Sequence, residues 1–188
     1  MENKINQKGI NVENGSVVGR DQRNTTYNFN TPPSQMTRLC IAFMEEARVN
    51  ETLTSILPEL EHYMSNVDAE KVIGLEEKLK AANRHDSLYD AARQKEIVAK
   101  RLHMHATSKA AQRIYTFILG MLLHRFRVHV KPLIDSGANK VEVDKAALGS
   151  VIEPIMEQLD ENVLDLYWDD IWGMIYYLTG NCHIKWAK

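Results

Sequence analysis

The stretch 109-KAAQRIYTFILGMLLHRF-126 decides the fold class of this 188-residue chain. Large apolar residues recur in it at intervals of three and four, at Ile114, Phe117, Ile118, Met121, Leu122 and Phe126. This spacing puts them on one face of an α-helix and predicts a long amphipathic helix with a buried stripe. The stripe starts earlier, at about Ser87, and Thr107-Ser108 is the expected break between two helices.

Helical spacing continues toward the N-terminus. Residues 34–47 carry an apolar stripe that includes Cys40, which makes this cysteine a small core residue. A second helix is expected after Asn50, kinked or broken by Pro58, and a third is expected to be capped by Asp68. These segments extend the helical body well ahead of the central stretch.

Toward the C-terminus, Pro132 is expected to end the central helix and Asp144 to cap the next one. A last helix runs from about Asp169 to Gly180, where glycine would take the left-handed conformation that follows many helices. The sequence therefore predicts a mainly α protein, with a bundle of about six or seven helices over residues 32–188.

Residues 1–31 differ from the rest because they are rich in Asn and Gly and poor in large apolar side chains. Asn14-Gly15 is a hairpin-turn signal, so this leader is expected to form a short β-hairpin-like segment. A lone hairpin is marginally stable in water, and docking or stacking of identical copies would protect its edges. A leader that never orders is the alternative. Thr31-Pro32-Pro33 is a stiff linker between the two parts.

The composition favours a cytoplasmic protein. No apolar run reaches the roughly 20 residues needed to cross a bilayer, the N-terminus has no secretory signal, and two cysteines suit a reducing compartment. We therefore expect no membrane association.

The net charge of −2 hides a strong segregation of charge. Residues 93–131 hold nine Lys and Arg and one acid, whereas residues 141–170 hold nine acids and one Lys. The basic stretch could face nucleic acid, with Arg125, Arg127 and Lys131 as candidate contacts. Alternatively, the two stretches lie side by side, within one chain or between chains, and neutralise each other.

No motif for an enzyme or a cofactor stands out. Glycine-rich phosphate loops are absent, and the spacing of the histidines suits no helical metal site. A metal site that joins His105 or His124 to Cys182-His183 is conceivable. Adjacent residues of an extended segment point to opposite sides, so Cys182 and His183 do not form a catalytic dyad alone. We expect a protein without cofactor or catalytic residues.

The C-terminal region carries an unusual density of aromatic side chains. Alternation within residues 182–186 predicts that Cys182, Ile184 and Trp186 face the core, while His183 and Lys185 face outward. Candidate partner-binding residues in this region are Trp168, Asp169, Asp170, Trp172, Tyr176, Tyr177, His183 and Trp186, although several of them must belong to the core.

Two stretches resemble a known family. Gln112-Arg113-Ile114-Tyr115, followed by Phe126 and Pro132, and above all 173-GMIYYLTGNCHIKW-186 are similar to the C-terminal domain of ABC-three-component systems. The resemblance covers roughly residues 70–188. The stretch 11-NVENGSVVGRDQRNTTYNF-29 of the leader also resembles the short Gly- and Asn-rich β element often found before such domains.

This resemblance implies a helical domain from a bacterial anti-phage operon that includes an SMC-like ABC ATPase. In that family the domain generally tethers an effector to the ATPase and brings no catalytic residues of its own. Nothing in this chain is long enough to be an effector enzyme. We therefore expect a non-enzymatic adaptor subunit that assembles with itself and docks onto the ATPase or another component.

Deletion of residues 1–31 is expected to reduce a discrete homo-oligomer to a smaller species, because the leader would supply the contacts between copies. Multi-angle light scattering measures the mass of both forms. A monomer in both cases would contradict the role assigned to the leader.

Overall fold

A computed structural model describes residues 32–49, 52–66, 74–159 and 161–188 of the chain. The regular structure in these ranges is helical throughout, without a strand, as the sequence predicts for the body of the protein. Residues 34–188 form one compact unit. The β-hairpin-like segment expected within residues 1–31 lies outside the described residues.

The described helices are α1 (Gln35–Val49), α2 (Pro58–Met64), α3 (Leu75–Ala81), α4 (Leu88–Met104), α5 (Lys109–Arg125), α6 (Lys131–Ser136), α7 (Lys140–Ala147), α8 (Glu153–Met156) and α9 (Trp168–Gly180). A short 3-10 turn, η1 (His85–Ser87), precedes α4. Two π-helical turns, η2 (Phe126–Val130) and η3 (Leu148–Ile152), join α5 to α6 and α7 to α8 without a break. The described part therefore contains seven continuous helices, which agrees with the predicted six or seven.

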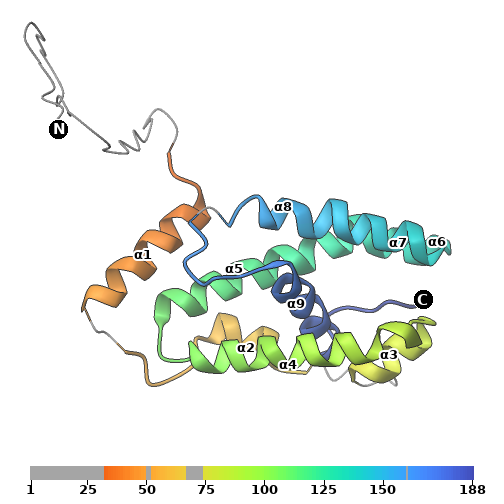
Figure 1. The fold of residues 1–188 in the computed structure, drawn as a ribbon, viewed down its shortest axis with the longest axis horizontal. Coiled ribbons are helices and arrows are strands. Elements are labelled where there is room, and N and C mark those ends of the chain that lie inside the picture. The colour runs from red at the N-terminus through yellow and green to blue at the C-terminus, as the bar shows by residue number, and fades with distance from the viewer. Residues whose placement is uncertain (1–31, 50–51, 67–73, 160) are drawn as a thin grey trace, which may run out of the picture. The chain divides into compact units, whose positions relative to one another are not determined.

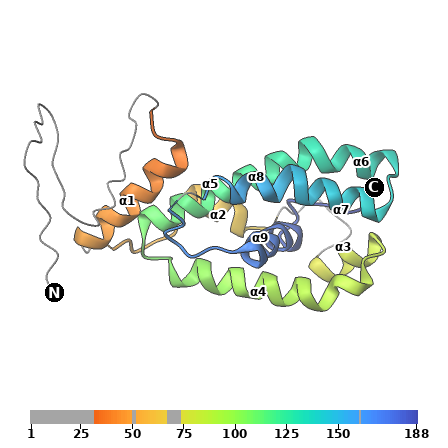
Figure 2. The same cartoon turned by 45° about the horizontal axis from the view of Figure 1, so that its top comes forward.

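Helix α9 lies between α4 and α5 and is surrounded by the rest of the bundle (Figure 1). The run from α5 to α6 and the run from α7 to α8 lie antiparallel, side by side, in both views (Figure 2). Helices α1 and α2 both pack against α5. Four residues of the predicted stripe of α5, Ile114, Ile118, Leu122 and Phe126, form the centre of this core and are at most 2% exposed, whereas Phe117 and Met121 are only half-buried.

Two prolines fall inside the long helical runs rather than at their ends. The expectation that Pro132 ends the central helix is wrong, because a π turn precedes it and the chain continues into α6. A proline has no N–H to donate and its ring crowds the carbonyl four residues earlier. A wider turn accommodates it, as the bond from the N–H of Lys131 to the carbonyl of Phe126 shows.

Pro154 repeats this arrangement in the neighbouring run, and its π turn is tied to α5. The carbonyl of Ser150, four residues before Pro154, cannot bond to a proline nitrogen. It accepts instead from Nε of Arg125, at 2.7 Å. A side chain of one helical run thus satisfies the backbone group that the proline of the other run leaves free.

Other helix boundaries differ from the predicted ones for local reasons. Pro58 occupies the first turn of α2, where its missing N–H costs nothing, rather than kinking a helix that began earlier. Asn139, not Asp144, caps α7 and forms a capping box with Glu142. Asp144 instead forms an ion pair with Arg84, at 2.6 Å. The proposed cap at Asp68 lies outside the described residues.

Helices α4 and α9 approach each other closely at Gly173. A Cβ atom built on this residue would lie 2.7 Å from the carbonyl oxygen of Gln94 and 2.8 Å from Cγ2 of Val98. Real Cβ atoms do not come so close, and the backbone of α4 cannot move aside as a flexible side chain can. The contact between these helices therefore depends on the absence of a side chain at Gly173.

Replacement of Gly173 by alanine is expected to lower the free energy of unfolding by about 1–3 kcal/mol, since the added methyl group forces the helices apart. Gly149→Ala is the matched control, because a Cβ there makes only an ordinary contact of 3.6 Å with Glu153 and alanine favours a helix. Urea denaturation compares the two variants. Equal stability of both would contradict the packing argument.

Candidate docking site

The predicted partner-binding residues divide into buried, half-buried and exposed groups. Asp170, Tyr177 and Trp186 are buried. Asp170 accepts from the backbone N–H of Tyr167 at 2.9 Å, which satisfies a free donor at the start of α9. Its other oxygen lies 2.9 Å from Nε of Arg101 on α4. This residue therefore fixes α9 in place and is not available to a partner.

Trp186 is also part of the core. Its indole Nε1 donates to Oγ1 of Thr179 at 3.0 Å, and its ring meets Phe126 edge to face, with centroids 5.0 Å apart. The guanidinium of Arg84 lies 4.3 Å above the same ring, in a cation–π contact. The C-terminal tail is thus anchored through this tryptophan.

The remaining tail residues follow the predicted alternation. Cys182, Ile184 and Trp186 are buried and Lys185 is exposed, as expected. The left-handed residue after α9 is Cys182, with φ of 66°, and not Gly180, which is still helical and packs against the side chain of Lys95. The prediction for Gly180 is therefore wrong.

His183 is half-buried rather than fully outward. Its ring lies against His62 and Tyr63 of α2, with centroids 5.3 and 5.8 Å away. Nδ2 of Asn181 donates to the carbonyl of Tyr63 at 3.0 Å and so ties the same tail to α2. Trp172 and Tyr176 are also half-buried and stack on each other, with centroids 6.1 Å apart.

Trp168 and Asp169 are the exposed members of the predicted set. Trp168 is 46% exposed, and its neighbour Tyr167, which the sequence analysis did not single out, is 61% exposed. Ile97 and Met104 of α4 are exposed as well. We call Ile97, Tyr167 and Trp168 the aromatic patch.

Hydrogen bonds hold the two parts of the aromatic patch next to each other. Nε2 of Gln94 donates to Asp169 at 3.3 Å, and Arg101 donates to the carbonyl of Leu164 at 3.3 Å. Residues 164–169 therefore run along the stretch of α4 that carries Ile97. The sequence could have indicated that Ile97 and Met104 are exposed. Both fall outside the buried stripe of α4, which contains Ala91, Val98 and Leu102.

The candidate nucleic-acid contacts are partly engaged within the chain. Nε of Arg125 bonds to Ser150, and Lys131 forms an ion pair with Asp135, while Arg127 is exposed. Contact with nucleic acid stays a prediction. The basic and acidic stretches meet at the ion pair between Arg101 and Asp170, as expected if they lie side by side.

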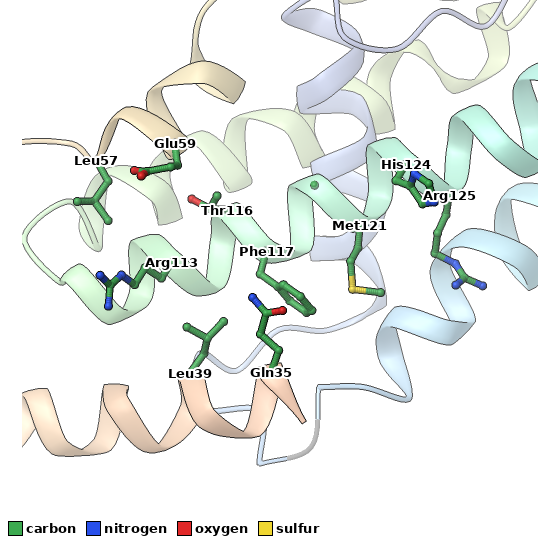
Figure 3. A pocket seen from close by; sticks show the side chains of 11 residues that line it. Gln35, Leu39, Leu57, Glu59, Arg113, Thr116, Phe117, Met121, His124 and Arg125 are labelled. Atoms are coloured by element: carbon green, nitrogen blue, oxygen red, sulfur yellow. The ribbon is translucent and has the colours of Figure 1, made fainter. Parts of the chain in front are cut away.

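A groove of about 750 Å³ runs along α5 between α1 and α2 (Figure 3). Its lining consists of Gln35 and Leu39 from α1, Leu57 and Glu59 at the start of α2, and Arg113, Thr116, Phe117, Gly120, Met121, His124 and Arg125 from α5. Phe117 and Met121 point toward α1, and the guanidinium of Arg125 turns away toward the neighbouring helical run. The sequence did not predict this groove, because it depends on how three separate helices pack.

Cysteine, histidine and tyrosine are the side chains of interest for catalytic or metal chemistry in the described part of the chain. Both cysteines are buried, and no group of three or more His, Cys, Asp or Glu within the described ranges could hold a metal ion. Nδ1 of His105 and the hydroxyl of Tyr115 are 3.0 Å apart. Burial raises the pKa of Tyr115 to about 12 and lowers the pKa of His105, so both groups are neutral at neutral pH.

None of the described helices is long and apolar enough to cross a membrane.

His183 should make stability depend on pH. In the folded chain the pKa of His183 lies below its usual value of 6.5. Burial is the larger cause, and the nearby His62 is the second. As pH falls, the unfolded chain takes up the proton first, so stability is lost below about pH 6.5. His183→Gln should lose less stability than the wild type between pH 7.5 and 5.5 in urea denaturation. His105 is present in both proteins, so its contribution is the same in both profiles. Parallel pH profiles of the two proteins would contradict the assignment of this pH dependence to His183.

Comparison with known proteins identifies the family. The family model for C-terminal domain 9 of the ABC-three-component systems matches residues 74–186, which is more than half of the chain. The match begins just before α3 and ends at Trp186, so α1 and α2 precede it. Neither a curated protein nor a solved structure gives a significant match. The chain belongs to the C-terminal domain 9 family of ABC-three-component systems, as the resemblance of its closing motif implies.

Proposed function

We propose that this chain is a non-enzymatic adaptor subunit of a bacterial anti-phage ABC-three-component system. It acts in the cytoplasm and assembles with itself. Its helical domain docks onto the SMC-like ABC ATPase or another protein component of the same system. Membership of the C-terminal domain 9 family supports a role as a component of such a system.

The observation that carries the docking role is the exposure of Tyr167 and Trp168 on a rigid support. Large aromatic side chains are costly to leave in water, and Trp and Tyr dominate the binding energy of many protein interfaces. Both residues lie at the start of α9, where Asp170 binds Arg101 and fixes the backbone. A surface that is already ordered loses little conformational entropy on binding.

The surroundings of the aromatic patch suit a protein partner. Ile97 extends its apolar area onto α4, and Asp169 beside Trp168 adds a carboxylate at the edge. An apolar centre with a polar rim is the usual anatomy of a protein interface. Scattered exposed apolar residues need no such explanation, but Ile97, Tyr167 and Trp168 lie on adjoining segments.

Trp168→Ala should weaken binding of the other components of the system by at least about tenfold, because it removes a central aromatic anchor. The control is Tyr89→Ala, which removes an aromatic side chain that is 80% exposed outside the aromatic patch. Surface plasmon resonance with the purified components measures both affinities. If Trp168→Ala binds as tightly as the control and the wild type, the patch is not the docking surface.

A further inference from the structure

The groove along α5 is built by specific polar contacts rather than left by loose packing. The carboxylate of Glu46 on α1 accepts from the backbone N–H of Ala110 at 2.7 Å, at the start of α5. This bond satisfies one of the free donors of the helix end. It also holds α1, which forms one wall of the groove, against the helix that forms the floor.

A buried glutamine holds the opposite wall. The side-chain oxygen of Gln112 accepts from the N–H of Leu57 at 2.6 Å, and its amide nitrogen donates to the carbonyls of Ala106 and Ser55, at 2.6 and 3.3 Å. Gln112 is fully buried, so these bonds are worth more than they would be in water. The first residue of the Gln-Arg-Ile-Tyr motif therefore positions the segment that leads into α2.

The floor of the groove is apolar in the middle and polar at its ends. Phe117 and Met121, with Leu39 from α1, supply the apolar part, and all three are half-buried. Arg113 lies toward one end and His124 toward the other, and both are exposed (Figure 3). They are eleven positions apart on α5, so their Cα atoms are separated by about 16 Å along the helix axis.

This spacing selects an elongated occupant. A volume of about 750 Å³ would also suit a small molecule. However, Arg113 and His124 start from backbone positions about three helical turns apart, and this separation suits a helix laid along α5 better than one phosphate or carboxylate. Binding of a helix by its apolar face in a groove is a common mode of recognition.

The charge of the groove favours an acidic partner. The lining offers Arg113 and His124 against one acid, Glu59, while the guanidinium of Arg125 points away from the groove and bonds to Ser150. Within the described residues, Arg113 and His124 take part in no ion pair. They are therefore available to a carboxylate of a bound chain.

We propose that the groove binds an amphipathic, acidic helix of another protein component of the system. Its apolar face lies on Leu39, Phe117 and Met121, and its carboxylates reach toward Arg113 and His124. The proposal rests on the adaptor role proposed above but uses a surface separate from the aromatic patch. Helices α1 and α2 precede the family match, so the groove is formed jointly by the family domain and the helices before it.

Photo-crosslinking locates the occupant in the assembled complex. The probe is p-benzoylphenylalanine, placed at position 121 of the full chain, with position 148 on the exposed Leu148 as the control. With the purified components, position 121 should crosslink to one segment whose apolar residues recur every three or four positions and which carries acids. No crosslink from position 121, or equal crosslinking of the same segment from position 148, would overturn the proposal.

A synthetic peptide of the crosslinked segment then tests the chemistry by fluorescence anisotropy. Met121→Glu should abolish binding, and Arg113→Glu, which changes only an exposed side chain and should leave the fold intact, should weaken it at least fivefold. Unchanged binding in Arg113→Glu would overturn the proposal, as would displacement of the peptide by a small molecule that copurifies with the chain.

Trp168→Ala separates the two surfaces. The peptide should bind this variant as tightly as the wild type, even where docking through the aromatic patch is lost. Two results together would reject the aromatic patch as the docking surface and support the groove. Trp168→Ala would still dock fully to the other components, and Arg113→Glu would no longer bind the peptide.

Discussion

The close contact between α4 and α9 at Gly173 is the constraint on which the rest of the domain depends. Because no side chain separates the helices there, the backbone of α4 lies against α9. Arg101 binds Asp170 at one end of α9, and Lys95 covers Gly180 at the other. Helix α9 is thus held along its whole length in the centre of the bundle. Its first residues emerge at the surface as an exposed aromatic pair, and its last residues lead into the tail.

The closing motif marks the family because it joins distant parts of the domain. Trp186 packs against Phe126 and beneath Arg84, and Asn181 binds the backbone of α2. Cys182 adopts a left-handed conformation that is unfavourable for a residue with a side chain. This turn directs the following residues back onto the bundle. Packing thus accounts for the positions of Cys182 and His183.

Helical periodicity predicted the elements well, since burial of one face repeats every three to four residues whatever the neighbouring helix is. The stripe of α5 and the break before Ser108 follow directly from it. The passage of the chain through Pro132 could not be predicted, because it requires a π turn instead of a helix end. Among the predicted contact residues, alternation in the tail placed Trp186 in the core, but nothing in the sequence separated Trp168 from Trp172. Only the packing shows that Trp168 is exposed and Trp172 half-buried. The groove depends on contacts across more than fifty residues, such as that of Gln112 with Leu57, and periodicity carries no information on these.

The chain thus combines a family domain with two preceding helices and presents two separate surfaces, one aromatic and one grooved. The central claim is that the domain acts by docking to another protein of its system through the aromatic patch. Hydrogen–deuterium exchange of the chain, alone and with the purified components, tests it most directly. The account predicts slower exchange in residues 164–170 and in the part of α4 around Ile97 when the components are present. Unchanged exchange in both segments, under conditions where a complex forms, would contradict it.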